Sequence, residues 1–203
     1  MPQVFDYDPP ERFVAGTVGQ PGSRTFFLQA RSGARVTSVA LEKGQVAILA
    51  ERVDELLDEV LRRSGGSAPV PALVPTDAED NDPLETPIDE EFRVGAMSLV
   101  WAVDAQRVII ECYSEGLTPE IEEDDEEARA EVEEAEPPSG PPASTTGDQE
   151  GSILRVSISG SAARAFAKRA LAVVAAGRPP CPFCAGPLDA DGHICPRSNG
   201  YRR

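Results

Sequence analysis

The sequence lacks the features that carry a chain into or across a membrane. Its longest uninterrupted apolar run, ALAVVAA at positions 170–176, is far shorter than the roughly 20 residues that a helix needs to span a bilayer. The first residues, MPQVFDYDPPERF, do not combine a cationic stretch with the apolar stretch that marks a signal peptide. We therefore expect a soluble, cytoplasmic protein that does not contact membranes.

Histidine and cysteine are also scarce. The 203 residues include one histidine and four cysteines, and three of these cysteines lie with the histidine in CPFCAGPLDADGHIC, positions 181–195. Because the cytosol keeps thiols reduced, such a cluster indicates a metal site or catalysis before it indicates disulfides. The fourth cysteine, Cys112, lies in an apolar run and is predicted to be a small buried side chain.

The cysteine cluster has the composition of a zinc site. Structural zinc takes four tetrahedral ligands from cysteine and histidine, and Cys181 and Cys184 have the usual C-x2-C spacing of a first pair. His193 and Cys195 would face the same side of an extended segment, so a hairpin through GPLDADG can bring them to the same ion. Their single-residue spacer is tighter than common zinc-finger spacings. The sequence predicts a structural Zn2+ ion held by three cysteines and one histidine.

Three alternatives to a structural zinc ion remain. A redox C-x-x-C pair normally opens a helix after a strand, but this pair follows a predicted helix and two prolines. A catalytic zinc ion keeps one coordination position open, whereas this motif already supplies four ligands. Disulfide pairing is the third alternative. We favour structural zinc, which would fold a C-terminal module too short to form its own core.

The formal net charge of -16 is concentrated in two segments. Residues 120–136 contain eleven acids and one arginine, and residues 77–91 contain eight acids and no base. The surrounding stretches, about 64–91 and 116–151, are rich in proline, glycine and serine and cannot bury enough apolar surface to offset chain entropy. We predict that both are disordered acidic linkers.

Periodicity predicts the secondary structure between these linkers. Short runs of β-branched and aromatic residues predict strands at 12–18, 24–30, 35–42, 92–105, 107–114 and 153–159. Apolar residues at alternating spacings of three and four predict an amphipathic helix at 44–63: Val46, Leu49, Val53, Leu56 and Val60. A second helix is predicted at 160–176.

Each half of the chain therefore has three strands followed by a helix, which is a weak sign of a βββα duplication. We predict an α+β fold over residues 1–178, in which an antiparallel sheet carries both helices on one face. Residues 179–203 are predicted to form the zinc-knuckle module.

Two further segments could carry chemistry. The glycines of GTVGQPGSR, positions 16–24, precede Arg24, but a predicted strand follows them instead of the helix that phosphate loops use, so a hairpin turn is favoured. An enzyme acting on a phosphorylated metabolite or nucleotide would need this loop and the carboxylates of Asp6, Asp8 or Glu11 to line one pocket. With the only histidine assigned to the metal, no Ser-His or Cys-His nucleophile set is available.

The basic C-terminal end offers another alternative. Arg197, Tyr201, Arg202 and Arg203 follow the cysteine cluster and could contact the phosphates of a nucleic acid. Eight lysines and arginines between Gly151 and Arg203 are nevertheless ordinary for a protein surface.

Three blocks of the sequence resemble an actinobacterial family described as a domain of unknown function, of DUF3090 type. The blocks are DPPERFVAGTVGQPGSRTFFLQA, TSVALEKGQVAILAERVDELLDEVL and GRPPCPFCAGPLDADGHICPRSNGYRR. The resemblance covers nearly the whole chain apart from the acidic linkers, and the last block is its most specific part. It implies no activity, although genes of this family accompany those of a phosphomutase-like and a kinase-like protein. We expect a non-enzymatic binding or adaptor protein whose partner is another protein or a small phosphorylated ligand, with nucleic acid less favoured.

Overall fold

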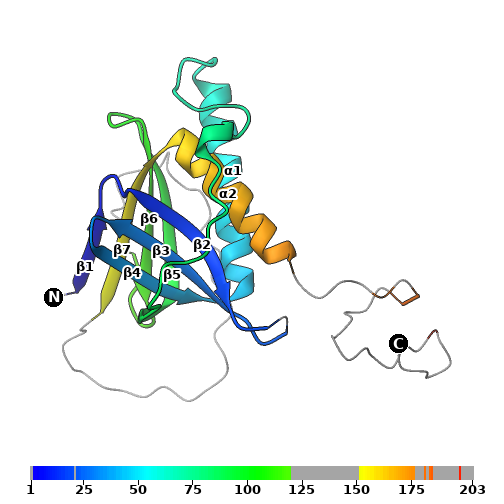
Figure 1. The fold of residues 1–203 in the computed structure, drawn as a ribbon. Coiled ribbons are helices and arrows are strands. Elements are labelled where there is room, and N and C mark those ends of the chain that lie inside the picture. Colours follow the sequence, from blue (N-terminus) through cyan, green and yellow to red (C-terminus); the bar gives the residue numbers. More distant parts are fainter. Residues whose placement is uncertain are drawn as a thin grey trace.

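Seven strands form one mixed β-sheet in the computed structural model, which describes residues 2–20, 22–119, 151–176, 181, 183–184 and 197 (Figure 1). The strands are β1 (Gln3–Tyr7), β2 (Arg12–Val18), β3 (Thr25–Ser32), β4 (Arg35–Leu41), β5 (Glu90–Ala102), β6 (Arg107–Ser114) and β7 (Ser152–Ser159). Their order across the sheet is β1-β7-β6-β5-β4-β3-β2. The helices are α1 (Lys43–Arg63), α2 (Gly160–Ala175) and the short 3-10 helix η1 (Thr76–Ala78).

The α+β class is confirmed, but the prediction of a purely antiparallel sheet is wrong. β4 pairs with β5 in parallel, because the chain passes through α1 and returns along the sheet before it enters β5. β1 also runs parallel to its neighbour β7. The other strand pairs are antiparallel. Three strands precede α2, as predicted, but four precede α1, because the sequence did not predict β1. The duplication itself stays a prediction.

Local side-chain contacts fix where the two helices begin. The main-chain N–H of Glu42 donates to Gln45 Oε1 at 2.9 Å, and Gln45 Nε2 donates to the carbonyl of Val94 at 3.0 Å, which attaches the start of α1 to β5. Ser159 caps α2 by accepting a hydrogen bond from the N–H of Ala162 at 3.3 Å. Neither α1 nor α2, the α-helices within the described residues, is long and apolar enough to span a membrane.

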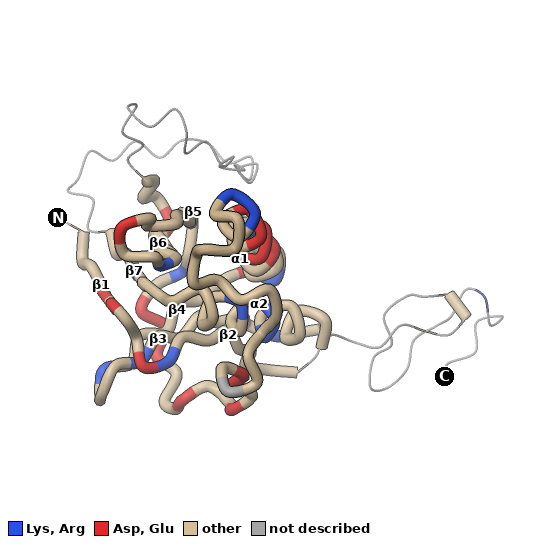
Figure 2. The backbone as a smooth tube through the Cα atoms, turned by 90° about the horizontal axis from the view of Figure 1, so that it is seen from above, with Lys and Arg blue, Asp and Glu red and all other residues tan. Residues whose placement is uncertain are grey.

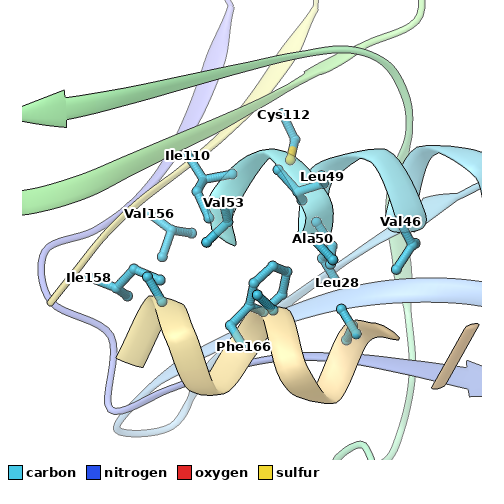
Figure 3. Packing of buried hydrophobic residues seen from close by; sticks show 14 of the residues in the cluster. Leu28, Val46, Leu49, Ala50, Val53, Ile110, Cys112, Val156, Ile158 and Phe166 are labelled. Carbon is cyan, nitrogen blue, oxygen red and sulfur yellow. The ribbon is translucent and has the colours of Figure 1, made fainter. Parts of the chain in front are cut away.

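Both helices pack on the same face of the sheet and form the main core with it (Figure 3). The buried stripe of α1 includes Val46, Leu49 and Val53, as its spacing predicted. Phe166 projects from α2 into this core, toward residues of α1 and of the strands (Figure 3). The fully buried residues on the sheet side include Leu28, Val39, Val108, Ile110, Leu154 and Val156. Burial of this continuous apolar surface is the main stabilising contribution to the fold.

The only strongly buried charge that joins the two helices belongs to Arg164, among the described residues. Its guanidinium donates to Asp54 Oδ1 at 3.0 Å and to Asp58 Oδ1 at 2.7 Å. These aspartates lie four positions apart and so occupy one face of α1. Figure 2 shows the acidic residues of α1 grouped along the helix. The pair of contacts fixes how α2 lies against α1.

The sheet curves, so that its first strand returns toward strands that are not its hydrogen-bonded neighbours. Tyr7 of β1 is buried, and its hydroxyl lies 2.8 Å from Thr37 Oγ1 of β4. The guanidinium of Arg35 lies 4.0 Å from the centre of the same tyrosine ring, a cation–π contact. Phe5 stacks on Phe92 with ring centres 6.4 Å apart. β1 therefore closes one side of the curved sheet.

The connection between α1 and β5 packs on the fold at two points, through Val70 in the main core and through Leu84 on the opposite face of the sheet. The sequence predicted that residues 64–91 form a disordered linker, but Val70 and Leu84 within it are buried. Leu84 joins a second apolar cluster with Val14, Phe27 and Ala40, against which Ile88 also packs. The disorder prediction is therefore wrong for these parts of the connection, because Val70 finds apolar partners in the main core and Leu84 finds them on the sheet. Residues 120–150 of the other predicted linker lie outside the described residues.

A substitution at Gly16 tests how tightly the connection packs against the sheet. A Cβ atom at Gly16 would lie 2.5 Å from Leu84 Cγ, so Gly16→Ala forces Leu84 to move. We expect Gly16→Ala to lower the free energy of unfolding by about 1–3 kcal/mol. The matched change Gly44→Ala, in the first turn of α1 with no atom within 4 Å of the new Cβ, should instead raise it by about 0.5 kcal/mol. Urea unfolding measures both values, and equal effects would contradict close packing of Leu84.

Candidate functional site

Two arginines converge on one carboxylate at the edge of the sheet. Arg12, the first residue of β2, donates from Nε to Asp80 Oδ2 at 2.5 Å and from Nη2 to Asp80 Oδ1 at 2.9 Å. Arg169 of α2 donates from Nη1 to the same Oδ1 at 2.8 Å. The side chains of Arg12 and Arg169 are each only 12% exposed, so their ion pairs with Asp80 are partly desolvated. Such bidentate contacts are stronger than those of a surface ion pair.

The same arginines bind the main chain of the connection. Arg169 donates to the carbonyls of Asp80 at 2.6 Å and Asp82 at 2.7 Å, and its Nε donates to the carbonyl of Ala15 in β2 at 2.8 Å. Arg12 also donates to the Asp82 carbonyl, at 2.9 Å. We call residues 79–88, which lie across this region, the strap. The strap is thus held to an edge strand and a helix at once.

A side-chain amide binds the next part of the strap. Gln29 of β3 donates from Nε2 to the carbonyl of Glu85 at 3.1 Å and accepts from the Glu85 N–H at Oε1, at 2.8 Å. Its Nε2 also donates to Ser38 Oγ at 3.1 Å, which orients the amide. The adjoining Leu84 side chain sits directly over Gly16. The sheet therefore recognises the backbone of the strap at one point and an apolar side chain beside it.

Two hollows adjoin the arginines. The larger has a volume of about 630 Å³, and is open to solvent along the strap from Asp80 to Thr86. The smaller, of about 220 Å³, lies between β2 and α2 and has Phe13 and Phe166 in its wall. Both hollows share Arg12 and Asp80. We call this region, with Arg31 at its far side, the arginine cleft.

The charges in the arginine cleft shift one another's pKa values. The hydrogen bonds from Arg12, and secondarily the Asp82 N–H and the charge of Arg169, hold the pKa of Asp80 below its ordinary value. The hydrogen bond with Asp80 raises the pKa of Arg12, whereas burial lowers the pKa of Arg169. Arginine stays protonated in proteins, so Arg12 and Arg169 are both positively charged at neutral pH.

The lowered pKa of Asp80 predicts a pH dependence of stability. Because the folded-state pKa lies below the unfolded value near 3.8, the ionised carboxylate stabilises the fold above that pH and loses this effect as pH falls. We expect Asp80→Asn to be less stable than the wild type by about 1–2 kcal/mol at pH 7, with the difference narrowing below pH 4. Urea unfolding of both proteins between pH 3 and 7 measures this difference in the free energy of unfolding.

Asp82→Asn serves as the control for this experiment. Asp82 binds the arginines through its main-chain carbonyl, so the loss of its side-chain charge should change stability little at any pH. A constant difference between wild type and Asp80→Asn from pH 3 to 7 would contradict the assigned role of the Asp80 carboxylate.

The structure separates the residues that the enzyme alternative required. The segment 16–24 contains the end of β2 and the turn into antiparallel β3, which confirms the predicted hairpin. Arg24 donates to the carbonyl of Ala176 at 2.5 Å, beyond the end of α2. Glu11 pairs with Arg31 at the other end of β2, about 20 Å away along a strand of this length. Asp8 pairs with Arg107 at the start of β6, and Asp6 lies in β1. Among the described residues, Arg24 and the carboxylates therefore do not line one pocket.

The predicted zinc ligands fall only partly within the described residues. Cys181 is buried and Cys184 is half-buried, while His193 and Cys195 lie outside the described residues, as do Arg202 and Arg203. Among the described residues no group of three potential metal ligands is present. Cys112 is fully buried, as predicted, and burial raises the pKa of its thiol to about 12. Its thiol therefore stays protonated and does not act as a nucleophile at neutral pH.

Sequence reasoning missed the residues of the arginine cleft. Asp80 lies within an acidic run, which is usually solvent-exposed, and Arg12 and Arg169 lie about 70 and 90 residues from it along the chain. One local signal was available. Pro83 and Leu84 interrupt the acidic run, and an apolar residue within such a run indicates a contact with the fold.

A second polar network lies on the sheet face away from the helices. Glu111 of β6 accepts hydrogen bonds at Oε2 from Ser98 Oγ at 3.0 Å and from the hydroxyl of Tyr113 at 2.6 Å. Arg155 of β7 lies 3.5 Å from Glu111 Oε1. Burial, with the hydrogen bond to Glu111, raises the pKa of Tyr113 to about 12, so its hydroxyl remains a donor. These cross-strand contacts join β5, β6 and β7.

Comparison with known proteins gives one family. Residues 5–195 match the family described as protein of unknown function, DUF3090. No curated protein and no solved structure matches the chain. Because the match extends over almost the whole sequence, from β1 to the last cysteine, the chain belongs to the DUF3090 family.

Proposed function

We propose that this protein is a non-enzymatic binding protein, an adaptor, whose arginine cleft holds an acidic segment of a protein partner. The observation that carries the proposal is the convergence of Arg12 and Arg169 on one carboxylate and on two neighbouring main-chain carbonyls. Planar guanidinium groups suit this bidentate recognition of carboxylates. The described surface of the cleft is thus built to hold an acidic peptide chain.

The shape of the cleft favours a chain over a small molecule. Sites for small ligands usually enclose most of the ligand within about 300–1,000 Å³. The larger hollow has a volume in this range but is an open groove, and the smaller hollow, at about 220 Å³, is below it. An extended peptide can lie along an open groove and gain contacts over its whole length. A small phosphorylated ligand is therefore the weaker candidate.

The chemistry of the cleft supports binding over catalysis. Its three arginines are all committed to ion pairs: Arg12 and Arg169 with Asp80, and Arg31 with Glu11 and Glu85. A general base or nucleophile needs a group that is not committed to a fixed ion pair. We therefore assign these charges to recognition.

The proposal includes a structural Zn2+ ion in residues 179–203. Cys181 and Cys184 retain the C-x2-C spacing of a zinc ligand pair, and the burial of Cys181 fits a site shielded from water. His193 and Cys195 would complete the set. A bound zinc ion would supply folding energy to this module and no catalytic step.

The adaptor function is tested by native co-purification with quantitative mass spectrometry. The wild type should retain one or more specific partners that are lost with Arg12→Gln. Arg52→Gln removes the same charge from the exposed surface of α1, where Arg52 pairs with Glu55 at 3.1 Å, and should retain them. Equal recovery with both variants would contradict binding at the cleft. Turnover of phosphorylated metabolites or nucleotides by purified protein would contradict the non-enzymatic assignment.

A further inference from the structure

The strap and the surface beneath it carry opposite charges. Asp80 pairs with Arg12 and Arg169, as described above, and two further pairs extend the pattern. Lys168 Nζ lies 2.5 Å from Glu79 Oε1, and Arg31 Nε lies 2.8 Å from Glu85 Oε1. The cations come from β2, β3 and α2, whereas every acid in these pairs comes from the strap. The fold therefore has a basic strip that its own acidic segment neutralises.

Much of this recognition does not depend on the particular side chains of the strap. Gln29 binds the N–H and carbonyl of Glu85, and both arginines bind the carbonyl of Asp82. The side chains that do matter are a carboxylate at position 80 and an apolar anchor at position 84. An extended segment with an acidic residue four positions before a leucine offers the same carboxylate, apolar anchor and main-chain groups.

The strap can leave without breaking the main core. The main core contains no residue of the strap, and the strap contributes only Leu84 and Ile88 to the smaller cluster on the opposite face. Before the strap, Val70 anchors the connection in the main core, whereas Leu73 is 82% exposed, so the chain between Val70 and the strap has little apolar packing at Leu73. Local opening of such a segment requires less free energy than unfolding of the domain. Opening would uncover Val14, Phe27 and Ala40 together with the basic strip.

We propose that the strap is a displaceable occupant of the arginine cleft, and that the partner is an acidic protein segment that binds there in the same extended manner. This inference rests on the proposed adaptor function and names its ligand class and its regulation. The strap keeps the cleft closed until a partner segment with an acidic residue and an apolar anchor replaces it. Tethering gives the strap an effective concentration on the order of millimolar, so a partner must bind the open cleft tightly to replace it.

A peptide with the sequence of residues 76–91, TDAEDNDPLETPIDEE, tests the inference in the full-length protein. The strap is loosened by the double change Asp80→Ala with Leu84→Ala, which leaves Arg12 and Gln29 in place. We expect the fluorescent peptide to bind this variant at least about tenfold more tightly than the wild type, because the competing strap no longer closes the cleft. Fluorescence anisotropy measures the dissociation constants.

Three controls define the binding mode. Adding Arg12→Gln to the loosened variant should abolish binding, and adding Gly16→Ala should weaken it, because the new Cβ occupies the place of the leucine anchor. Adding Gly44→Ala should leave binding unchanged. A scrambled peptide of the same composition should bind at least about tenfold more weakly if the pattern matters beyond charge.

Several outcomes would overturn the inference. The first is that the peptide does not bind the folded loosened variant, and the second is that the scrambled peptide binds equally well. The third is that inorganic phosphate alone displaces the peptide, which would indicate a phosphate site. If the loosened variant does not fold, hydrogen exchange on the wild type replaces it. Excess peptide should then speed exchange of the Glu85 amide, which Gln29 otherwise binds. Unchanged exchange would also overturn the inference.

The experiment separates this inference from the proposed function. Suppose that Arg12→Gln loses a native partner but the strap peptide does not bind. The adaptor function would then be supported, and the strap would be rejected as a mimic of the partner segment. Peptide binding without a native partner that depends on Arg12 would reject the adaptor function as stated.

Discussion

Phe166→Ala is expected to lower the free energy of unfolding by about 3–5 kcal/mol, a large part of the stability of a domain of this size. Phe166 keeps only 2% of its surface exposed and projects from α2 toward α1 and the sheet (Figure 3). Its ring stacks on that of Phe13 with centres 4.7 Å apart and planes 19° apart. The substitution removes this contact and leaves a cavity between α2 and β2. Urea unfolding followed by circular dichroism measures the change.

Leu73→Ala provides the control for this core substitution. Leu73 is 82% exposed, so removal of its side chain should change stability by less than about 0.5 kcal/mol. A loss below about 1 kcal/mol for Phe166→Ala would mean that the core repacks around the missing ring. Phe166 also lines the smaller hollow of the arginine cleft. Its loss should therefore weaken binding at the cleft in any variant that still folds.

The sequence predicted those elements whose signals are local. The periodic apolar residues of α1 and α2 place their bounds within one residue of the structure, because a helix completes its hydrogen bonds within its own segment. The strands β2, β3 and β4 could be predicted equally well, since Gly-containing turns separate short runs of β-branched residues. Each of these elements carries its own evidence within about 20 residues.

The elements that sequence analysis missed depend on distant partners. β1 has only five residues and pairs in parallel with β7, which lies about 150 residues later, so no hairpin signal accompanies it. The parallel contact of β4 and β5 likewise depends on the path of the chain through α1. Direction and neighbour choice in a sheet are set by tertiary packing, which a local pattern does not contain.

The arginine cleft was missed for a related reason. A composition of proline, glycine and acids predicts disorder when a segment is considered alone, because it cannot form its own core. Leu84 does not need such a core, since Val14, Phe27 and Ala40 already present an apolar surface to it. Likewise the charge of Asp80 is offset by Arg12 and Arg169, which belong to other elements. Segments that dock on a folded surface need fewer apolar residues than segments that fold independently.

Cys184→Ser is expected to abolish zinc binding altogether. We expect the purified wild type to contain about one equivalent of zinc with three sulfur neighbours at roughly 2.3 Å and one nitrogen neighbour at roughly 2.0 Å, as Cys181, Cys184, His193 and Cys195 would supply. Serine at position 184 cannot provide the thiolate, and three remaining ligands hold zinc much more weakly. Elemental analysis and X-ray absorption spectroscopy measure the metal content and its neighbours.

The effect on folding should be confined to the C-terminal module. Since ligand binding and folding share one free energy in so small a unit, metal loss should make residues 179–203 the first site of proteolysis. The domain before it should unfold as in the wild type, because the main core, as far as the structure describes the chain, is formed by residues up to Val174. Cys112→Ala should retain the zinc ion, since Cys112 is buried in that core. Protein prepared under reducing conditions without a chelator and found free of zinc would contradict the site. Unfolding of the whole chain by Cys184→Ser would instead show that the module and the domain form one cooperative unit.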